Sequence, residues 1–138
     1  MHRFVQDGRI YCDPRVESDG DVLDERKVLL GNILIEPGGR LIYEYDFGDD
    51  WKHELLCEEF VELDTHPPYA ICTEGARACP PEDSGGPYAY EDLVRVLKNP
   101  RHKDYAEMRA WVGGRFNPET FDAEEINRRL SRELKRKK

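Results

Sequence analysis

The most regular feature of the chain is an alternation of apolar and polar positions over residues 41–47. Large apolar side chains occupy every second position there, which is the period of a β-strand. The Gly-Asp-Asp triplet at 48–50 follows as a turn, and apolar positions resume over residues 51–63. The pattern therefore predicts an antiparallel hairpin over residues 41–63.

The alternation also predicts how the two strands of this hairpin face each other. A three-residue turn places Phe47 opposite Trp51 and Tyr45 opposite His53. These side chains then share one face, which is aromatic and core-like, while the other face is mostly charged. A slip of one residue would break the agreement between the two strands, so the pattern supports this register.

Shorter elements are expected before the hairpin. Residues 1–11 indicate two extended pieces joined at Asp7-Gly8, a dipeptide typical of a tight hairpin turn. Residues 13–26 are polar and turn-rich and are expected to form a loop. Residues 27–35 are apolar and interrupted by a glycine, so they fit either a short strand or a helical turn.

After the hairpin, a long irregular stretch precedes segments with helical spacing. Residues 64–88 hold five of the nine prolines and predict an ordered, packed loop. Helices are expected over residues 88–99 and 100–112, the second capped by the Asn-Pro pair at 99–100. A third helix begins at Asp122, where a glutamate three positions later completes a capping box.

These elements predict an α+β fold, with an antiparallel sheet centred on the 41–63 hairpin and packed by two or three C-terminal helices. The length of 138 residues fits one domain. No stretch approaches the roughly 18 apolar residues that a membrane helix needs, and no signal-peptide pattern opens the chain. We therefore expect a cytoplasmic protein without a membrane partner.

The formal net charge of −8 is unevenly distributed. Residues 128–138 contain seven basic residues and one acidic residue, so this basic tail carries +6 and the rest of the chain carries −14. An acidic body repels phosphate backbones, so nucleic acid is expected to bind through the tail or not at all. The structural alternative for the tail is a solvated helix end, where Lys and Arg favour the helix dipole.

The cysteines are Cys12, Cys57, Cys72 and Cys79. Reduced thiols are the default in a cytosolic protein. Two alternatives remain open for Cys72 and Cys79, namely a disulfide or a metal site with His53. Structural zinc sites use more closely spaced cysteine pairs, so the spacing alone does not specify one.

Four segments, in order along the chain, resemble one protein family. They are YDFGDDWKHE (45–54), YAICTEGARACPPEDSGGPYAYEDL (69–93), NPRHKDY (99–105) and WVGGRFNPETFDAEEIN (111–127). This series resembles the plasmid pRiA4b Orf-3-like family, which is also labelled an insertion-element passenger or TnpR-type protein. The resemblance implies an α+β fold and an association with mobile elements, but no defined chemistry. It also implies that residues 1–138 form a single domain that lacks the family's N-terminal strand and helix.

An acidic cluster surrounds the predicted turn. Asp46, Asp49 and Asp50 offer the oxygen ligands that hard cations such as magnesium prefer. Together with His53 and Glu82 they could form a metal-dependent hydrolase that acts on a phosphoester. The structural alternative is ordinary turn chemistry for the acids and a core position for His53.

The leading hypothesis is a binding or interaction module without established catalysis, whose partner is an unidentified protein or small ligand. The binding residues would be Asp46, Asp49, Asp50, Trp51, His53, Cys79, Glu82 and Asp83. No cofactor is expected under this hypothesis, whereas the hydrolase alternative requires a divalent metal. Its catalytic candidates are His53, Glu82 and Asp83. Its candidate metal ligands are Asp46, Asp49, Asp50, His53, Cys72 and Cys79.

Overall fold

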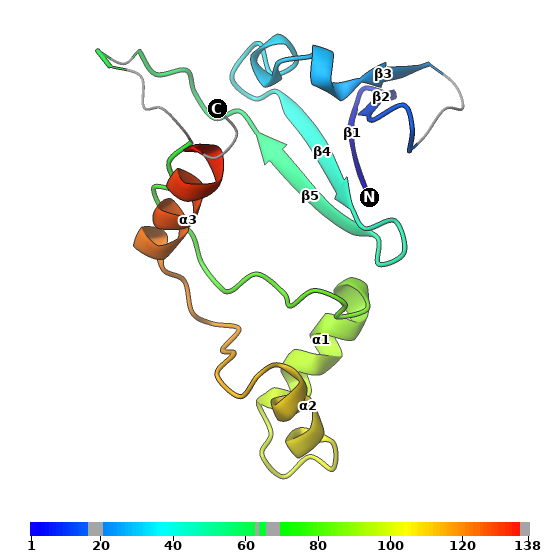
Figure 1. Ribbon diagram of the computed structural model, residues 1–138, viewed down its shortest axis with the longest axis vertical. Helices are drawn as coiled ribbons and strands as arrows, with labels where there is room; N and C mark the ends of the chain where they lie inside the picture. The colour runs from blue at the N-terminus through cyan, green and yellow to red at the C-terminus, as the bar shows by residue number, and fades with distance from the viewer. Residues whose placement is uncertain (17–20, 63, 66–69, 136–138) are drawn as a thin grey trace. The chain divides into compact units, whose positions relative to one another are not determined.

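The computed structural model describes residues 1–16, 21–62, 64–65 and 70–135 (Figure 1). The chain divides into two compact units. The first unit comprises Met1–Glu62 and Asp83–Tyr90, and the second comprises Leu63–Glu82 and Glu91–Lys138. The sheet belongs to the first unit, and most of the helical sequence belongs to the second.

The first unit is built on a five-stranded sheet with the strand order β3-β2-β1-β4-β5. The strands are β1 (His2–Gln6), β2 (Arg9–Cys12), β3 (Val22–Asp24), β4 (Arg40–Tyr45) and β5 (Trp51–Leu56). All neighbouring pairs are antiparallel except β2 and β3, which are parallel. Together with three α-helices in the described residues, this sheet confirms the predicted α+β class.

The first hairpin is confirmed in position and in its turn. Asp7 and Gly8 both have positive φ angles, of 49° and 79°, which the two central residues of a type I′ turn require. The hairpin pairs Phe4 with Tyr11 across β1 and β2. Because β1 also pairs Phe4 with Tyr43 of β4, all three rings lie on one face of the sheet.

The second hairpin is confirmed, but its predicted register is wrong by two residues. Tyr45 lies opposite Trp51, and Tyr43 lies opposite His53. Residues 46–50 therefore form a five-residue loop in place of the predicted three-residue turn. A shift of two residues keeps every side chain on its predicted face, because the side-chain period of a strand is two.

The five-residue loop follows from how the chain turns after Tyr45. The carbonyl of Asp46 accepts hydrogen bonds from the amides of Asp49 and Asp50, at 3.0 and 2.8 Å. Both Asp46 and Asp50 have left-handed backbones, with φ angles of 52° and 55°, a conformation that aspartate tolerates better than most residues. β5 then ends at Leu56, so the predicted return strand is too long.

The segment between the hairpins differs from its prediction. Within the polar loop expected over 13–26, β3 adds to the sheet edge, and a 3₁₀ turn follows at Glu25–Lys27. A second 3₁₀ turn at Leu30–Asn32 decides the ambiguous apolar run in favour of a helical turn. Asp24 caps the first turn by accepting a hydrogen bond from the amide of Arg26.

The buried core of the first unit is small. Leu41 and Cys12 are almost completely buried, at 1% and 0% exposure, and Tyr11 and Leu34 are also buried. His53 is exposed, so the core position considered for it is wrong. β5 is an edge strand, and a residue on it has a neighbouring strand on one side only.

The helices are α1 (Gly86–Leu97), α2 (Tyr105–Trp111) and α3 (Ala123–Lys135). α1 and α3 begin within two residues of their predicted starts. α2 begins five residues later than predicted, because residues 99–104 form turns in which Asn99 accepts a hydrogen bond from the amide of Arg101. No helix among the described residues is long and apolar enough to cross a membrane.

In the second unit, α3 binds the preceding loop through its Asn127. The side-chain oxygen of Asn127 accepts from the amide of Cys72, and its nitrogen donates to the carbonyl of Cys72, both at 2.8 Å. The basic tail continues α3, and its first two arginines pair with Glu124 and Glu125. Residues 136–138 of the tail lie outside the described residues.

Candidate functional site

The predicted acidic cluster holds the second hairpin turn and fixes it to the start of α1. The carboxylate of Asp46 accepts a hydrogen bond from the amide of Gly48 at 3.1 Å. Asp49 accepts one from the amide of Gly85, also at 3.1 Å. The backbone of Gly86 passes so close to Asp49 that a Cβ atom there would lie 2.3 Å from its carbonyl oxygen.

Trp51 also contacts α1, and the residues just before α1 have an unusual backbone and a buried side chain. Trp51 meets Tyr90 of α1 edge-to-face, with ring centroids 6.1 Å apart. Asp83 has a left-handed backbone, with φ of 59°. Ser84 is buried, and its hydroxyl has no hydrogen-bond partner within the described part of the chain. Asp49 and Trp51 therefore have a structural role, because both contact the segment that leads into and forms the start of α1.

The remaining predicted residues do not complete a metal site. His53 is exposed on the sheet, and its Nδ1 lies 3.4 Å from the carbonyl oxygen of Tyr43. Cys79 and Glu82 are exposed and belong to the second unit. Across the residues placed by the structure, no three His, Cys, Asp or Glu side chains could hold a metal ion together. The metal-dependent hydrolase alternative therefore has no support.

The cysteines are all free thiols. Cys12 is buried in the sheet, Cys57 and Cys72 are half-buried, and Cys79 is exposed. No disulfide joins Cys72 to Cys79, so this alternative is wrong for the structure described. Cys72 contributes to the second unit through its backbone, which Asn127 binds.

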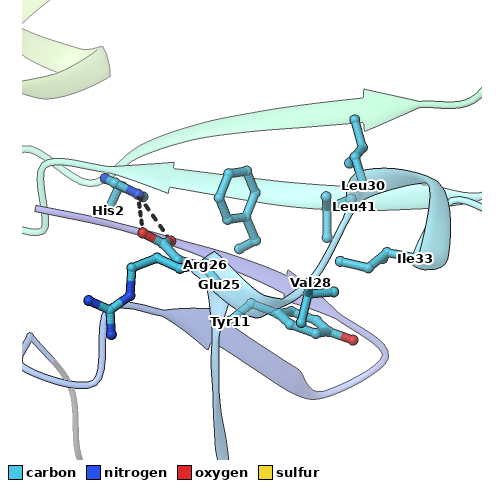
Figure 2. A pocket seen from close by; sticks show the side chains of 9 residues that line it. His2, Tyr11, Glu25, Arg26, Val28, Leu30, Ile33 and Leu41 are labelled. Atoms are coloured by element: carbon cyan, nitrogen blue, oxygen red, sulfur yellow. Dashed lines mark hydrogen bonds and ion pairs between the residues drawn. The ribbon is translucent and has the colours of Figure 1, made fainter. Parts of the chain in front are cut away.

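A pocket of about 350 Å³ lies on the aromatic face of the sheet (Figure 2). Its size is at the small end of the range for ligand pockets. One part of its wall comes from the sheet and the other from the segment that carries the two 3₁₀ turns. The lining residues are His2, Phe4, Tyr11, Glu25, Arg26, Val28, Leu30, Ile33 and Leu41.

The pocket has one polar end and one apolar end. Figure 2 shows His2, Glu25 and Arg26 grouped at one side, with Leu30 and Ile33 at the other. Nε2 of His2 lies 3.1 Å from both carboxylate oxygens of Glu25. The Glu25 side chain is only 19% exposed, so this carboxylate is partly shielded from solvent.

Arg26 is already engaged outside the pocket. Its Nε donates to Asp24 at 2.8 Å, and its Nη1 lies 3.9 Å from Asp13. The guanidinium of Arg26 lowers the pKa of the Asp24 carboxyl to about 2. A hydrogen bond from Arg15 lowers the pKa of Asp13 well below its usual range. These groups neutralise one another and leave Glu25 paired with His2.

Aromatic rings continue from the polar end of the pocket along the sheet. Tyr43 is the centre of this aromatic platform, which consists of His2, Phe4, Tyr43, Tyr45 and His53. The ring of Tyr43 lies 4.9 Å from Phe4 and 5.6 Å from both histidines, between centroids. Burial, and secondly the charge of Glu25, raises the pKa of Tyr43 above its ordinary value.

Sequence reasoning found the sheet side of this pocket but missed the other wall. The alternation placed Leu41 and Tyr43 on an aromatic face, as observed. Glu25 was part of an expected loop, and Val28 belonged to an apolar run of undecided structure. No motif links these residues to the first strand, so only the folded chain brings them together.

The structure thus defines an α+β protein whose sheet carries a pocket of ligand size on its aromatic face. Residues 1–125 match the family model described as plasmid pRiA4b ORF-3-like protein. The chain belongs to this family, as its sequence motifs indicate.

Two relatives agree with this membership. Uncharacterized protein y4hQ of Sinorhizobium fredii is 37% identical over 97 residues, which are 69% of this chain and 48% of that protein. The chain therefore spans about half the length of this relative. The crystal structure of a protein of unknown function, MM3350 from Methanosarcina mazei Go1, has 33% identity and a TM-score of 0.74. That likeness covers 91% of this chain and 71% of the other.

Proposed function

We propose that this protein is a non-catalytic binding module and that its ligand site is the pocket on the aromatic face of the sheet. The observation that carries this proposal is the concave, largely apolar wall with a few polar groups, His2, Glu25 and Arg26, at one end. Such a combination of apolar surface and a few placed polar groups is typical of small-molecule sites. The ligand would be a small organic molecule with an apolar body.

The predicted surface around the turn, His53 and the proline loop stays a prediction. Within it, the carboxylates of Asp46 and Asp49 already accept hydrogen bonds from backbone amides, so they have fewer acceptor sites left for a partner. His53 is exposed on the aromatic platform. A ligand that extends beyond the pocket along the platform would reach this histidine.

The proposal is tested by mapping ligand binding on the isotopically labelled protein. A library of small aromatic and aliphatic fragments is titrated in, and amide chemical-shift changes are followed by NMR. Changes concentrated at residues 2–4, 25–33 and 41–43 are expected. Val28→Trp fills the pocket and should abolish them. Val61→Trp is the matched control, because Val61 is exposed and lies outside the pocket lining. Shift changes that survive Val28→Trp would contradict the proposal.

We further propose a cytoplasmic location. Its support is the presence of four cysteines as free thiols, a state that reducing compartments maintain. Fractionation of cells expressing the tagged full-length protein tests this location, and recovery with the secreted or membrane fraction would contradict it.

A further inference from the structure

We infer that the ligand class of this pocket is an organic cation, namely an amine with an apolar or aromatic body. The inference rests on the binding function proposed above. It adds the sign of the ligand's charge and the groups that recognise it. Three observations support it: the charge at the polar end, the rings beside that charge, and the apolar wall opposite.

The charge at the polar end is a carboxylate without a permanent cationic partner. Among the residues that the structure describes, the ion-pair partner of Glu25 is His2, which is charged only when protonated. The permanent cations close by are committed elsewhere, since Arg26 and Lys27 both pair with Asp24. An ammonium group that enters the pocket would therefore compete only with His2 for this partly shielded carboxylate, and such charge-assisted hydrogen bonds are the stronger kind.

Aromatic rings lie next to the histidine that pairs with this carboxylate. The ring of His2 lies 6.0 Å from Phe4 and 5.6 Å from Tyr43, between centroids. Burial, and secondly the charge of the nearby Glu25, raises the pKa of the Tyr43 phenol. A carboxylate combined with several ring faces is the arrangement that recognises organic ammonium ions, because each ring face attracts a cation.

The opposite end selects the body of the ligand. Val28, Leu30 and Ile33 form one wall, and Leu41 closes the floor from β4. These side chains offer no hydrogen bonds, so they favour an aliphatic chain or a phenyl ring. An anionic ligand would instead need Arg26, which Asp24 and Asp13 already hold.

Three probes of nearly equal size and different charge test the inference. They are 2-phenylethylamine, which is an ammonium ion at pH 7, the neutral 2-phenylethanol, and 3-phenylpropionate. NMR titration of the full chain at pH 7 and low salt gives the dissociation constant of each. The amine is expected to bind about tenfold more tightly than the alcohol, the difference that one charge-assisted hydrogen bond supplies. The carboxylate is expected to bind most weakly.

A pair of charge-removing variants assigns this preference to one residue. Glu25→Gln keeps the size of the side chain and removes its charge, so the amine should bind about tenfold more weakly while the alcohol changes little. Glu58→Gln is the matched control, because Glu58 is exposed and does not line the pocket. Its amine affinity should equal that of the unmodified chain. An unchanged amide spectrum of Glu25→Gln away from the pocket confirms that the variant folds.

The outcomes separate this inference from the binding function on which it rests. If the alcohol or the carboxylate binds as well as the amine, and Val28→Trp abolishes that binding, the pocket is a ligand site and the charge preference is refuted. If Glu25→Gln leaves the preference intact, the assignment to Glu25 is refuted. If no probe binds, or if Val28→Trp leaves amine binding unchanged, both the inference and the proposed function fail.

Discussion

The close approach of Gly86 to Asp49 makes a sharp prediction about the stability of the first unit. Gly86→Ala adds a Cβ atom 2.3 Å from the carbonyl oxygen of Asp49. Backbone atoms cannot rotate out of the way, so either the turn or the start of α1 has to move by about 1 Å to restore a normal contact. We expect this variant to fold with a separated turn and helix.

The size of the effect follows from the contacts that would be lost. An alanine at Gly86, where φ is 81°, carries the cost of a left-handed backbone, about 1–2 kcal/mol. The movement also breaks the hydrogen bond from Gly85 to Asp49, which contributes about 1 kcal/mol. Loss of the edge-to-face contact between Trp51 and Tyr90 adds about 1 kcal/mol. The steric part of the cost is therefore about 2 kcal/mol.

A second glycine isolates that steric part. Gly8 has nearly the same φ, 79°, and a Cβ atom there would meet nothing within 4 Å. Gly8→Ala therefore carries the backbone cost alone. The two variants are compared by urea denaturation, followed by the fluorescence of Trp51 in a Trp111→Phe background. The chain contains two tryptophans, so this background isolates the signal of Trp51.

Gly86→Ala should lower the free energy of unfolding by about 2 kcal/mol more than Gly8→Ala. It should also shift the emission of Trp51 in the native state, because the ring loses its neighbour on α1. Equal destabilisation by the two substitutions, with unchanged native emission, would refute the reasoning.

Three further predictions concern single contacts. Asn127→Ala should cost about 1–3 kcal/mol and speed hydrogen exchange of the Cys72 amide, because both bonds to that residue are lost. Asn127→Asp keeps the acceptor, so its stability should lie between that of Asn127→Ala and that of the unmodified chain. Unchanged hydrogen exchange of the Cys72 amide in Asn127→Ala would contradict the role given to these two bonds. Asp122→Ala should cost about 1 kcal/mol in a circular-dichroism melt, since it removes the N-cap of α3, whereas Asp122→Asn should melt close to the unmodified chain. Because the pKa of Tyr43 is raised in the fold, the neutral phenol stabilises the folded state. This stabilisation is fully present below about pH 10 and is lost as the pH rises through the raised pKa. Carbon-13 titration of the tyrosine rings should show Tyr43 ionising late, and Glu25→Gln should bring its pKa down; a Tyr43 that titrates with the other tyrosines would contradict this.

The sheet was predictable wherever a local pattern was sufficient. Alternation identified β4 and the face of each side chain, and Asp7-Gly8 identified the first turn. The register of the second hairpin was not predictable from alternation. A slip of two residues leaves every side chain on the same face, so the pattern cannot detect it. The left-handed backbones of Asp46 and Asp50 and the hydrogen bonds to the Asp46 carbonyl lengthen the loop to five residues.

The pocket depended on contacts that no local pattern encodes. β3 has three residues, which is too short to show a period, and it joins the sheet through a parallel pairing with β2. Glu25 follows β3 directly, so its approach to His2 depends on that pairing. The acidic turn illustrates the reverse case. Its carboxylates suggested chemistry from the sequence, whereas two of them bind backbone amides in the fold.

The double hydrogen bond between Asn127 and residue 72 also governs which substitutions the two positions tolerate. Both bonds end on peptide atoms, which every residue except proline provides. These two bonds therefore do not depend on the side chain at position 72, and only proline would remove the amide. Position 127, by contrast, accepts few residues if both bonds are to form. Aspartate lacks the donor, and glutamine holds its amide one carbon farther from α3. We therefore expect relatives that keep this contact to vary at the loop position and to retain asparagine at the helix position.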